Sequence, residues 1–152
     1  MSRRDQIRMT DEEVAAFLEG GKTLQVATIG PEGAPNLVAM WYAVVDGKCA
    51  FWTYGKSQKV VDLRRDDRIT CLVEDGDRYS ELRGVELRGR GEIVEDRAAI
   101  DRIGEAVAAK YTGPVDDNVR AGLAVVGAKR VGIVVHPDRV ISWDHHKLGG
   151  AY

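Results

Sequence analysis

The clearest chemical signal in this sequence comes from a short segment, TYGKSQK, which leaves a strand-like run and enters a helix-like run. A helix start offers free backbone N–H groups and a partial positive charge. Thr53 and Ser57 add hydroxyl groups, Lys56 and Lys59 add positive charges, and Gly55 lets a ligand approach the backbone closely. These groups favour phosphate binding. The alternative is a capped surface helix that carries two solvated lysines.

Other candidate clusters are weaker. The adjacent His145 and His146 would point apart on a strand, and no acidic or cysteine residue has ligand spacing to them, so we predict no metal site. Neither Ser57 nor Ser142 belongs to a His/Asp arrangement typical of a nucleophile. The sequence therefore identifies no catalytic residue.

Composition narrows the class of protein. A chain of 152 residues fits one domain, residues 1–152, with one core. Lys plus Arg total 22 and Asp plus Glu total 24, and the net charge of −2 argues against a nucleic-acid partner. No apolar run approaches the ~20 residues of a membrane helix, and residues 1–8 lack the apolar part of a secretory signal. Cys49 and Cys71 lie in strand-like runs, as expected for reduced core cysteines of a cytoplasmic protein.

Helical signals occur at four places. Thr10 and Glu13 have capping-box spacing before the apolar stripe of Val14, Phe17 and Leu18, which Gly20-Gly21 ends. Ser57 can cap a short helix over 58–64. Asp96 can cap a helix whose apolar face holds residues 100, 103, 107 and 111, and another short helix is expected over 116–125.

Strand-like runs fill most of the remaining chain. They cover 23–29, 36–45, 48–53, 68–74, 82–94, 131–135 and 139–143, with turns at 30–33, 46–47, 75–76 and 136–138. Three glycines in 82–94 indicate a bulge, a bend or close approach of a ligand. The pattern predicts an α+β, mainly β fold, in which a largely antiparallel sheet closes as a small barrel with short flanking helices. Residues 1–9 are expected to be flexible, and 145–152 form a polar tail.

The run from Leu24 to Val94 resembles the pyridoxamine-phosphate-oxidase-like split-barrel superfamily. The matching features are LQVATIGPEGAPNLVAMWY, the hairpin DGKCAFWT, the segment SQKVVDLRRDDRITCLV and the strand ELRGVELRGRGEIVED. The ending VISWDHHKLGGAY resembles the actinobacterial branch that uses the deazaflavin coenzyme F-420. The resemblance covers nearly the whole chain and implies the FMN-binding split β-barrel fold.

The resemblance also implies a cofactor site. The ring would lie along Val38, Ala39, Met40 and Trp41, and Trp52 and Thr53 would contact the ring and its ribityl chain. Ser57, Gln58 and Lys59 would hold the phosphate. Arg64 and Arg65 are weaker candidates for the anionic tail of F-420, with a solvated helix end as the alternative.

In this superfamily the cofactor lies at the interface of a homodimer. The resemblance therefore implies that Arg83 and Gly84 reach the site from the second subunit, and that Trp143 and the region of His145 close the pocket across the dimer. The tail 145–152 is a candidate for packing on the partner. Apolar residues on both faces of the long strands, such as Leu37 and Val38, also favour a dimer.

The function implied is that of a deazaflavin-dependent oxidoreductase, which moves a hydride from reduced F-420 to an electron-poor organic acceptor. The alternatives are an FMN-dependent enzyme of the same fold and a non-catalytic flavin- or haem-type binding protein. Vitamin B6 oxidation is not expected, because Gln58 stands where the true oxidases carry an arginine. Their C-terminal motif of arginines around a histidine is also not matched by WDHH. A tail histidine, Tyr42 or solvent would donate the proton.

Overall fold

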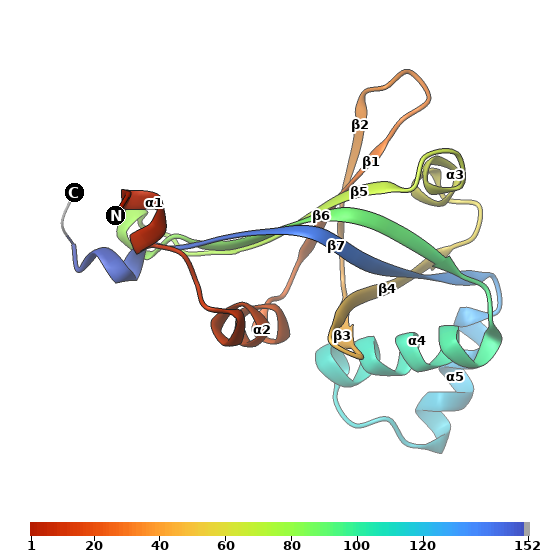
Figure 1. Cartoon of the computed structure of the whole chain (residues 1–152). Coiled ribbons are helices and arrows are strands. Elements are labelled where there is room, and N and C mark those ends of the chain that lie inside the picture. The colour runs from red at the N-terminus through yellow and green to blue at the C-terminus, as the bar shows by residue number, and fades with distance from the viewer. Residues whose placement is uncertain (151–152) are drawn as a thin grey trace.

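A computed structural model describes residues 1–150 of the chain. Within them, seven strands form one antiparallel sheet in the order β2-β1-β5-β6-β7-β4-β3. The strands are β1 Leu24–Ile29, β2 Pro35–Met40, β3 Ala43–Val45, β4 Lys48–Tyr54, β5 Arg68–Asp75, β6 Arg83–Val94 and β7 Arg130–Asp144. The edge strands β2 and β3 are consecutive in the chain, and the sheet curls between them (Figure 1). The α+β split barrel predicted from the sequence is confirmed.

Helices flank this sheet on several sides. They are α1 Arg3–Gln6, α2 Asp11–Gly20, α3 Gln58–Arg65, α4 Arg97–Thr112 and α5 Asp117–Gly127, with the 3-10 turns η1 Tyr79–Glu81 and η2 His145–Leu148. Several local signals behave as predicted. The Thr10 and Glu13 side chains form a reciprocal capping box, and the Asp96 side chain accepts from the Ala99 N–H. None of the described helices combines the length and apolar character that crossing a bilayer needs.

Two of the predicted elements were wrong. The single strand expected over 36–45 is broken at Trp41-Tyr42 into β2 and β3, and this break is the split in the barrel. The turn expected at 136–138 is absent, because β7 runs through it as one strand of 15 residues. The register with β6 shifts there, between Arg88 and Gly89. A β-bulge thus accommodates Pro137, which has no N–H to donate.

The core has two parts. The first fills the barrel and includes Leu24, Tyr42, Phe51 and Val85, each of which is fully buried. The second lies between β4 and α4, where Trp52 packs with Ala50, Ile100 and Ile103. Successive residues of β4 therefore point alternately into the barrel and toward α4. Thr53 follows the barrel-facing side and Trp52 the helix-facing side.

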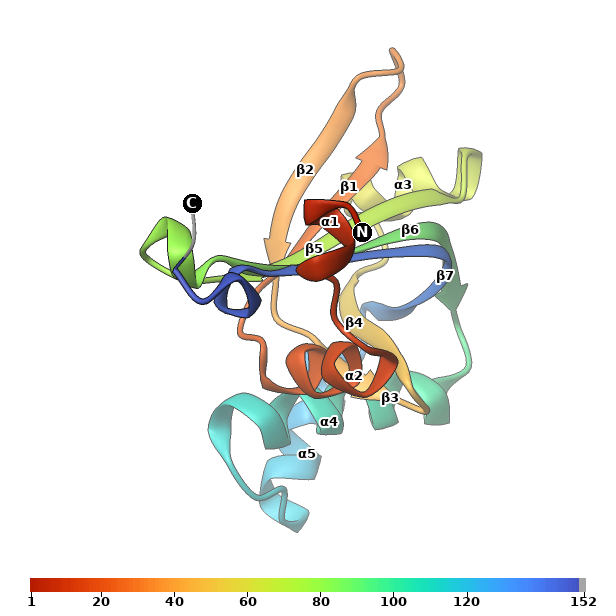
Figure 2. The ribbon, with the colours of Figure 1, turned by 60° about the vertical axis from the view of Figure 1, so that its left-hand side comes forward.

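Strands β5, β6 and β7 continue beyond the barrel as an arm, which we define as Val73–Asp75, Arg83–Val85 and Ser142–Asp144. The turns η1 and η2 lie together at its tip, and α1 lies beside the arm (Figures 1 and 2). The Asp144 N–H donates to the Ile7 carbonyl at 2.7 Å, and the Met9 N–H donates to the Ser142 hydroxyl at 3.1 Å. These contacts join the N-terminal segment to the arm; its flexibility stays a prediction. Residues 151–152 of the predicted tail lie outside the described residues.

Candidate cofactor site

The segment from Thr53 to Lys59 places three polar side chains together where β4 ends and α3 begins. The Lys59 ammonium donates to the Thr53 hydroxyl at 3.0 Å, and the Ser57 hydroxyl lies 3.4 Å from the same oxygen. The Ser57 N–H donates to the Tyr54 carbonyl at 2.9 Å, which closes the turn. Ser57 is the N-cap residue of α3, but its side chain makes no capping hydrogen bond, contrary to the sequence prediction. Its hydroxyl is instead beside Thr53.

Lys59 is the charged member of this group. Burial lowers the pKa of its ammonium. Within residues 1–150 no carboxylate forms an ion pair with it, and its hydrogen-bond partner is the neutral Thr53 hydroxyl. A half-buried cation without a counter-ion attracts an anion, because placing opposite charge beside it offsets its lost hydration. The geometry therefore suits a phosphate group.

A buried carboxylate holds α3 against the sheet. Asp62 is fully buried and accepts hydrogen bonds from the Thr28 hydroxyl at 2.8 Å and the Gln58 amide at 2.8 Å. Asn36 and Arg65 lie farther away, each at 3.4 Å. Burial alone would raise the pKa of Asp62, but these hydrogen bonds outweigh it and lower the pKa below the ordinary 3.8. The Gln58 side chain is thus engaged by Asp62, which leaves its backbone N–H for a phosphate.

Two arginines beside this segment, Arg64 and Arg65, already bond to other groups of the chain. Arg64 pairs with Glu95 at 2.6 Å, and Arg65 donates to the Ile29 carbonyl at 2.5 Å. Neither of these arginines is therefore a ready partner for an anionic tail. Lys56 is exposed at the turn itself.

Two basic residues that the sequence did not single out, Lys129 and Arg130, lie just before β7 and at its first position. The Gly55 N–H donates to the Lys129 carbonyl at 3.0 Å, and Arg130 is the partner of Tyr54 in the ladder. The Arg130 guanidinium lies over the Trp52 and Tyr54 rings, at 4.9 and 4.8 Å from their centroids, and its Nε is buried without a hydrogen-bond partner. The pairing of β4 with β7 brings Arg130, which is distant in sequence, to the end of β4, but its guanidinium lies on the helix-facing side with Trp52, opposite to Thr53.

The residues predicted to line the ring divide between two faces. Val38 and Met40 point inward and pack against the barrel core, whereas Ala39 and Trp41 are exposed on the outer face. The Trp52 side chain is only 8% exposed and packs under α4.

Tyr42, a candidate proton donor, is fully buried, and its hydroxyl donates to the Leu18 carbonyl at 2.5 Å. Burial also raises its pKa. Tyr42 is therefore removed as a candidate.

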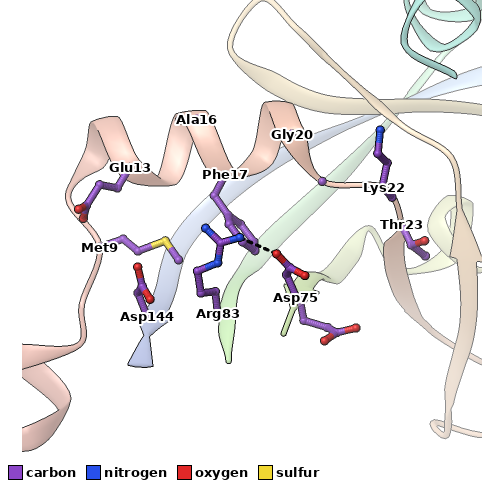
Figure 3. Close-up of a pocket in the computed structure, with 12 residues that line it drawn as sticks. Met9, Glu13, Ala16, Phe17, Gly20, Lys22, Thr23, Asp75, Arg83 and Asp144 are labelled. Carbon is purple, nitrogen blue, oxygen red and sulfur yellow. Dashed lines mark hydrogen bonds and ion pairs between the residues drawn. The ribbon is translucent and has the colours of Figure 1, made fainter. Parts of the chain in front are cut away.

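Arg83, Gly84 and Trp143 lie on the arm. The Trp143 ring covers Gly84 so closely that an added Cβ would sit 2.1 Å from it. Arg83 pairs with Asp75 at 2.5 Å and lies over the Phe17 ring at 5.2 Å. Figure 3 shows this arginine between α2 and Asp75, at the edge of a cavity of about 730 Å³ that Met9, Phe17 and Glu74 also line.

Within one chain, the arm residues lie far from the group formed by Thr53, Ser57 and Lys59. β6 spans 12 residues from Arg83 to Val94, a length of about 36 Å at roughly 3.3 Å per residue. Val94, the last residue of β6, pairs with Gly132 of β7, and Thr53 of β4 pairs with the preceding residue, Val131. Thr53 therefore lies just beyond the end of β6 that is opposite to Arg83. Figure 1 shows α3 and the tip of the arm at opposite ends of the molecule. The predicted site residues therefore do not form a single site within one chain.

Comparison with protein-family models decides the family. Residues 10–144 match the model described as pyridoxamine 5'-phosphate oxidase. The chain belongs to this family. Among curated proteins no match is found.

Across residues 1–150, no three His, Cys, Asp or Glu side chains gather as a metal site would require.

Solved structures extend the family comparison. The chain is 46% identical to the conserved hypothetical protein Rv2991 from Mycobacterium tuberculosis, with a TM-score of 0.95 over 100% of this chain and 95% of that chain. It is 28% identical to a protein described as F-420 reductase, with a TM-score of 0.63 over 82% of this chain and 93% of the other. The haem storage protein HutZ from Vibrio cholerae, at 14% identity and TM-score 0.66 over 87% and 94% of the two chains, shares the fold.

Proposed function

We propose that this member of the pyridoxamine 5'-phosphate oxidase family is an oxidoreductase that uses the deazaflavin F-420 to reduce an electron-poor organic acceptor. The observation that carries the proposal is the half-buried Lys59 ammonium, which lies with Thr53 and Ser57 at the start of α3 without a counter-ion. The structural similarity to a protein described as F-420 reductase supports the choice of cofactor.

The residues of this chain would bind and orient the cofactor. Lys59, Ser57 and the backbone N–H of Gln58 would hold its phosphate, and the Asp62 network would keep α3 at a fixed distance from the sheet. When bound, reduced F-420 supplies the hydride. The protein's part is to position the ring and to exclude water around it. Cys49 and Cys71 are free and buried, which supports a reducing, cytoplasmic setting.

A homodimer would complete the site. Because Lys59 and Arg83 lie at opposite ends of one subunit, one cofactor can contact both kinds of residue only if Arg83 of the partner subunit approaches Lys59. The exposed Leu37 on the edge strand β2 gives a second subunit apolar surface to cover. Sedimentation at micromolar concentration should show a dimer; a species of 16.7 kDa alone would contradict it.

FMN is the competing cofactor, since it carries the same phosphate. F-420 differs by an anionic lactyl-glutamyl tail, which would find Lys56 and Lys129 beside Gly55. Exposed ion pairs contribute only about 0–1 kcal/mol each and are screened by salt. We therefore expect a modest, salt-sensitive preference for F-420.

The test is a titration of the purified protein with F-420 and FMN, at low and high salt. We expect micromolar or tighter binding of F-420, weaker binding of FMN, and loss of the preference at high salt. Lys129→Ala should weaken F-420 and leave FMN unchanged, whereas Arg64→Ala, the control, should change neither. Tight FMN binding without affinity for F-420 would favour the FMN enzyme instead.

A further inference from the structure

Trp41 is a large aromatic residue that remains open to solvent. Its side chain is 56% exposed, whereas Trp52 is only 8% exposed. The Trp41 ring stacks on Tyr111 with centroids 4.4 Å apart and an angle of 3° between the planes. Parallel stacking covers one face of the indole, so the exposed surface is its opposite face and its edges.

Two hydrogen bonds to the backbone hold the Tyr111 side chain in place. It lies in the last turn of α4, and its hydroxyl donates to the Lys22 carbonyl at 2.8 Å. The same hydroxyl accepts from the Tyr42 N–H at 3.3 Å. Tyr111 is thus tied to the backbone just before β1 and to the break between β2 and β3.

Lys110 supports the same region from the preceding position. Its ammonium lies 3.7 Å from the centroid of the buried Tyr42 ring and 5.4 Å from that of Tyr111. The Nζ atom is itself buried and has no hydrogen-bond partner, so the aromatic faces are its main compensation. The last turn of α4 therefore contacts Trp41 and Tyr42 through Lys110 and Tyr111, at the break between β2 and β3.

We propose that Tyr111 is a positioning residue, which fixes Trp41 so that its open face can stack on the ring of the bound cofactor. This inference rests on the proposed function, because the ring ligand is the flavin or deazaflavin considered there. A side chain already held in its binding geometry loses little conformational entropy when a ligand stacks on it. Without Tyr111, the indole would rotate freely and lose this advantage.

The test uses a double-mutant cycle with two ring ligands: F-420, and riboflavin, which has no phosphate. Trp41→Leu and Tyr111→Leu should each weaken both ligands about tenfold, the range for stacking of a heterocycle on an aromatic side chain. The double variant should be no weaker than Trp41→Leu alone, because Tyr111 acts through Trp41. Tyr111→Phe, which keeps the stack, should remain within about threefold of the parent.

Two further measurements separate positioning from a general loss of structure. Ligand-induced quenching of tryptophan fluorescence should fall in Trp41→Leu and Tyr111→Leu and persist in Tyr111→Phe. The salt dependence of F-420 binding should be unchanged in all three variants, because stacking involves no ion pair. If the parent binds these ligands and the leucine variants bind as tightly, or if their losses simply add in the double variant, only this inference fails. If the parent binds no flavin or deazaflavin, the proposed function fails with it.

Discussion

At the residue scale, Asp62 fixes the position of α3, at whose start Lys59 lies. Its fully buried carboxylate accepts from Thr28 on β1 and from Gln58 in the first turn of α3, and so ties the helix to the sheet. Asp62→Asn would remove the charge and turn an amide N–H₂ toward groups that donate. We expect a loss of about 2–3 kcal/mol in the free energy of unfolding, measured by urea denaturation at neutral pH.

The pH dependence of the same variant gives a second check. The pKa of Asp62 is lowered in the folded state, so its stabilisation is present above the unfolded value of 3.8 and is lost as the pH falls through the folded value. Asp62→Asn should therefore unfold with a weaker acid dependence than the parent. An unchanged acid profile would mean that Asp62 makes no such contribution.

Lys59 is the residue on which cofactor binding should depend most. Lys59→Met keeps most of the apolar stem but removes the charge, so F-420 and FMN should both bind about tenfold or more weakly, since a charge-assisted hydrogen bond contributes roughly 1.5–3 kcal/mol. Lys48→Met, at the opposite end of β4, is the matched control and should bind as the parent does. Equal affinity of the Lys59 variant would show that the phosphate binds elsewhere.

At the scale of elements, α4 packs on β4 through a glycine. A Cβ at Gly104 would lie 2.4 Å from the Trp52 ring, which fills the space between helix and strand. Alanine normally favours a helix over glycine, but here it would push the indole away. We expect Gly104→Ala to lower stability by about 1–3 kcal/mol.

Gly122 in α5 offers the control for this prediction. No atom lies within 4 Å of a Cβ built there, so Gly122→Ala should gain helix propensity without a clash, roughly 0.5–1 kcal/mol. Thermal unfolding of the two variants should move in opposite directions. A stabilised Gly104 variant would contradict the packing described for Trp52.

Features set by neighbouring residues were largely predictable, whereas two features that depend on strand pairing were not. The capping box at Thr10 and the Asp46-Gly47 turn, with φ of 51° and 76°, depend on neighbouring residues alone. The bulge at Pro137 resembles a turn locally, and only its partner Gly89 shows that the strand continues. An unbroken apolar run concealed the split at Trp41.

The same distinction applies to the site. Thr53, Ser57 and Lys59 are close in sequence, and their grouping at the start of α3 could be inferred from spacing, whereas phosphate binding stays a prediction. Arg130 reaches the end of β4 through the β4–β7 ladder, and Tyr111 reaches Trp41 through the packing of α4, which no local pattern reveals. Residue type alone also could not show that Arg64 and Arg65 are engaged elsewhere.

At the scale of the whole molecule, the proposed function requires two subunits, because the arm and α3 lie at opposite ends of one chain. The arm carries Arg83 at one end, and Lys59 lies beyond the other end of β6. In a two-fold symmetric dimer each site would receive Lys59 from one subunit and Arg83 from the other. Two subunits with different defects could then complement each other.

A mixed dimer tests this claim most directly. Lys59→Met and Arg83→Gln chains, carrying different tags, are co-expressed, and the heterodimer is purified and titrated with F-420. One of its two sites would contain both parental residues, so we predict parental affinity at about half the parental stoichiometry, while each variant homodimer binds about tenfold more weakly. A heterodimer as weak as the two homodimers, or a chain that remains monomeric, would contradict a site shared between subunits.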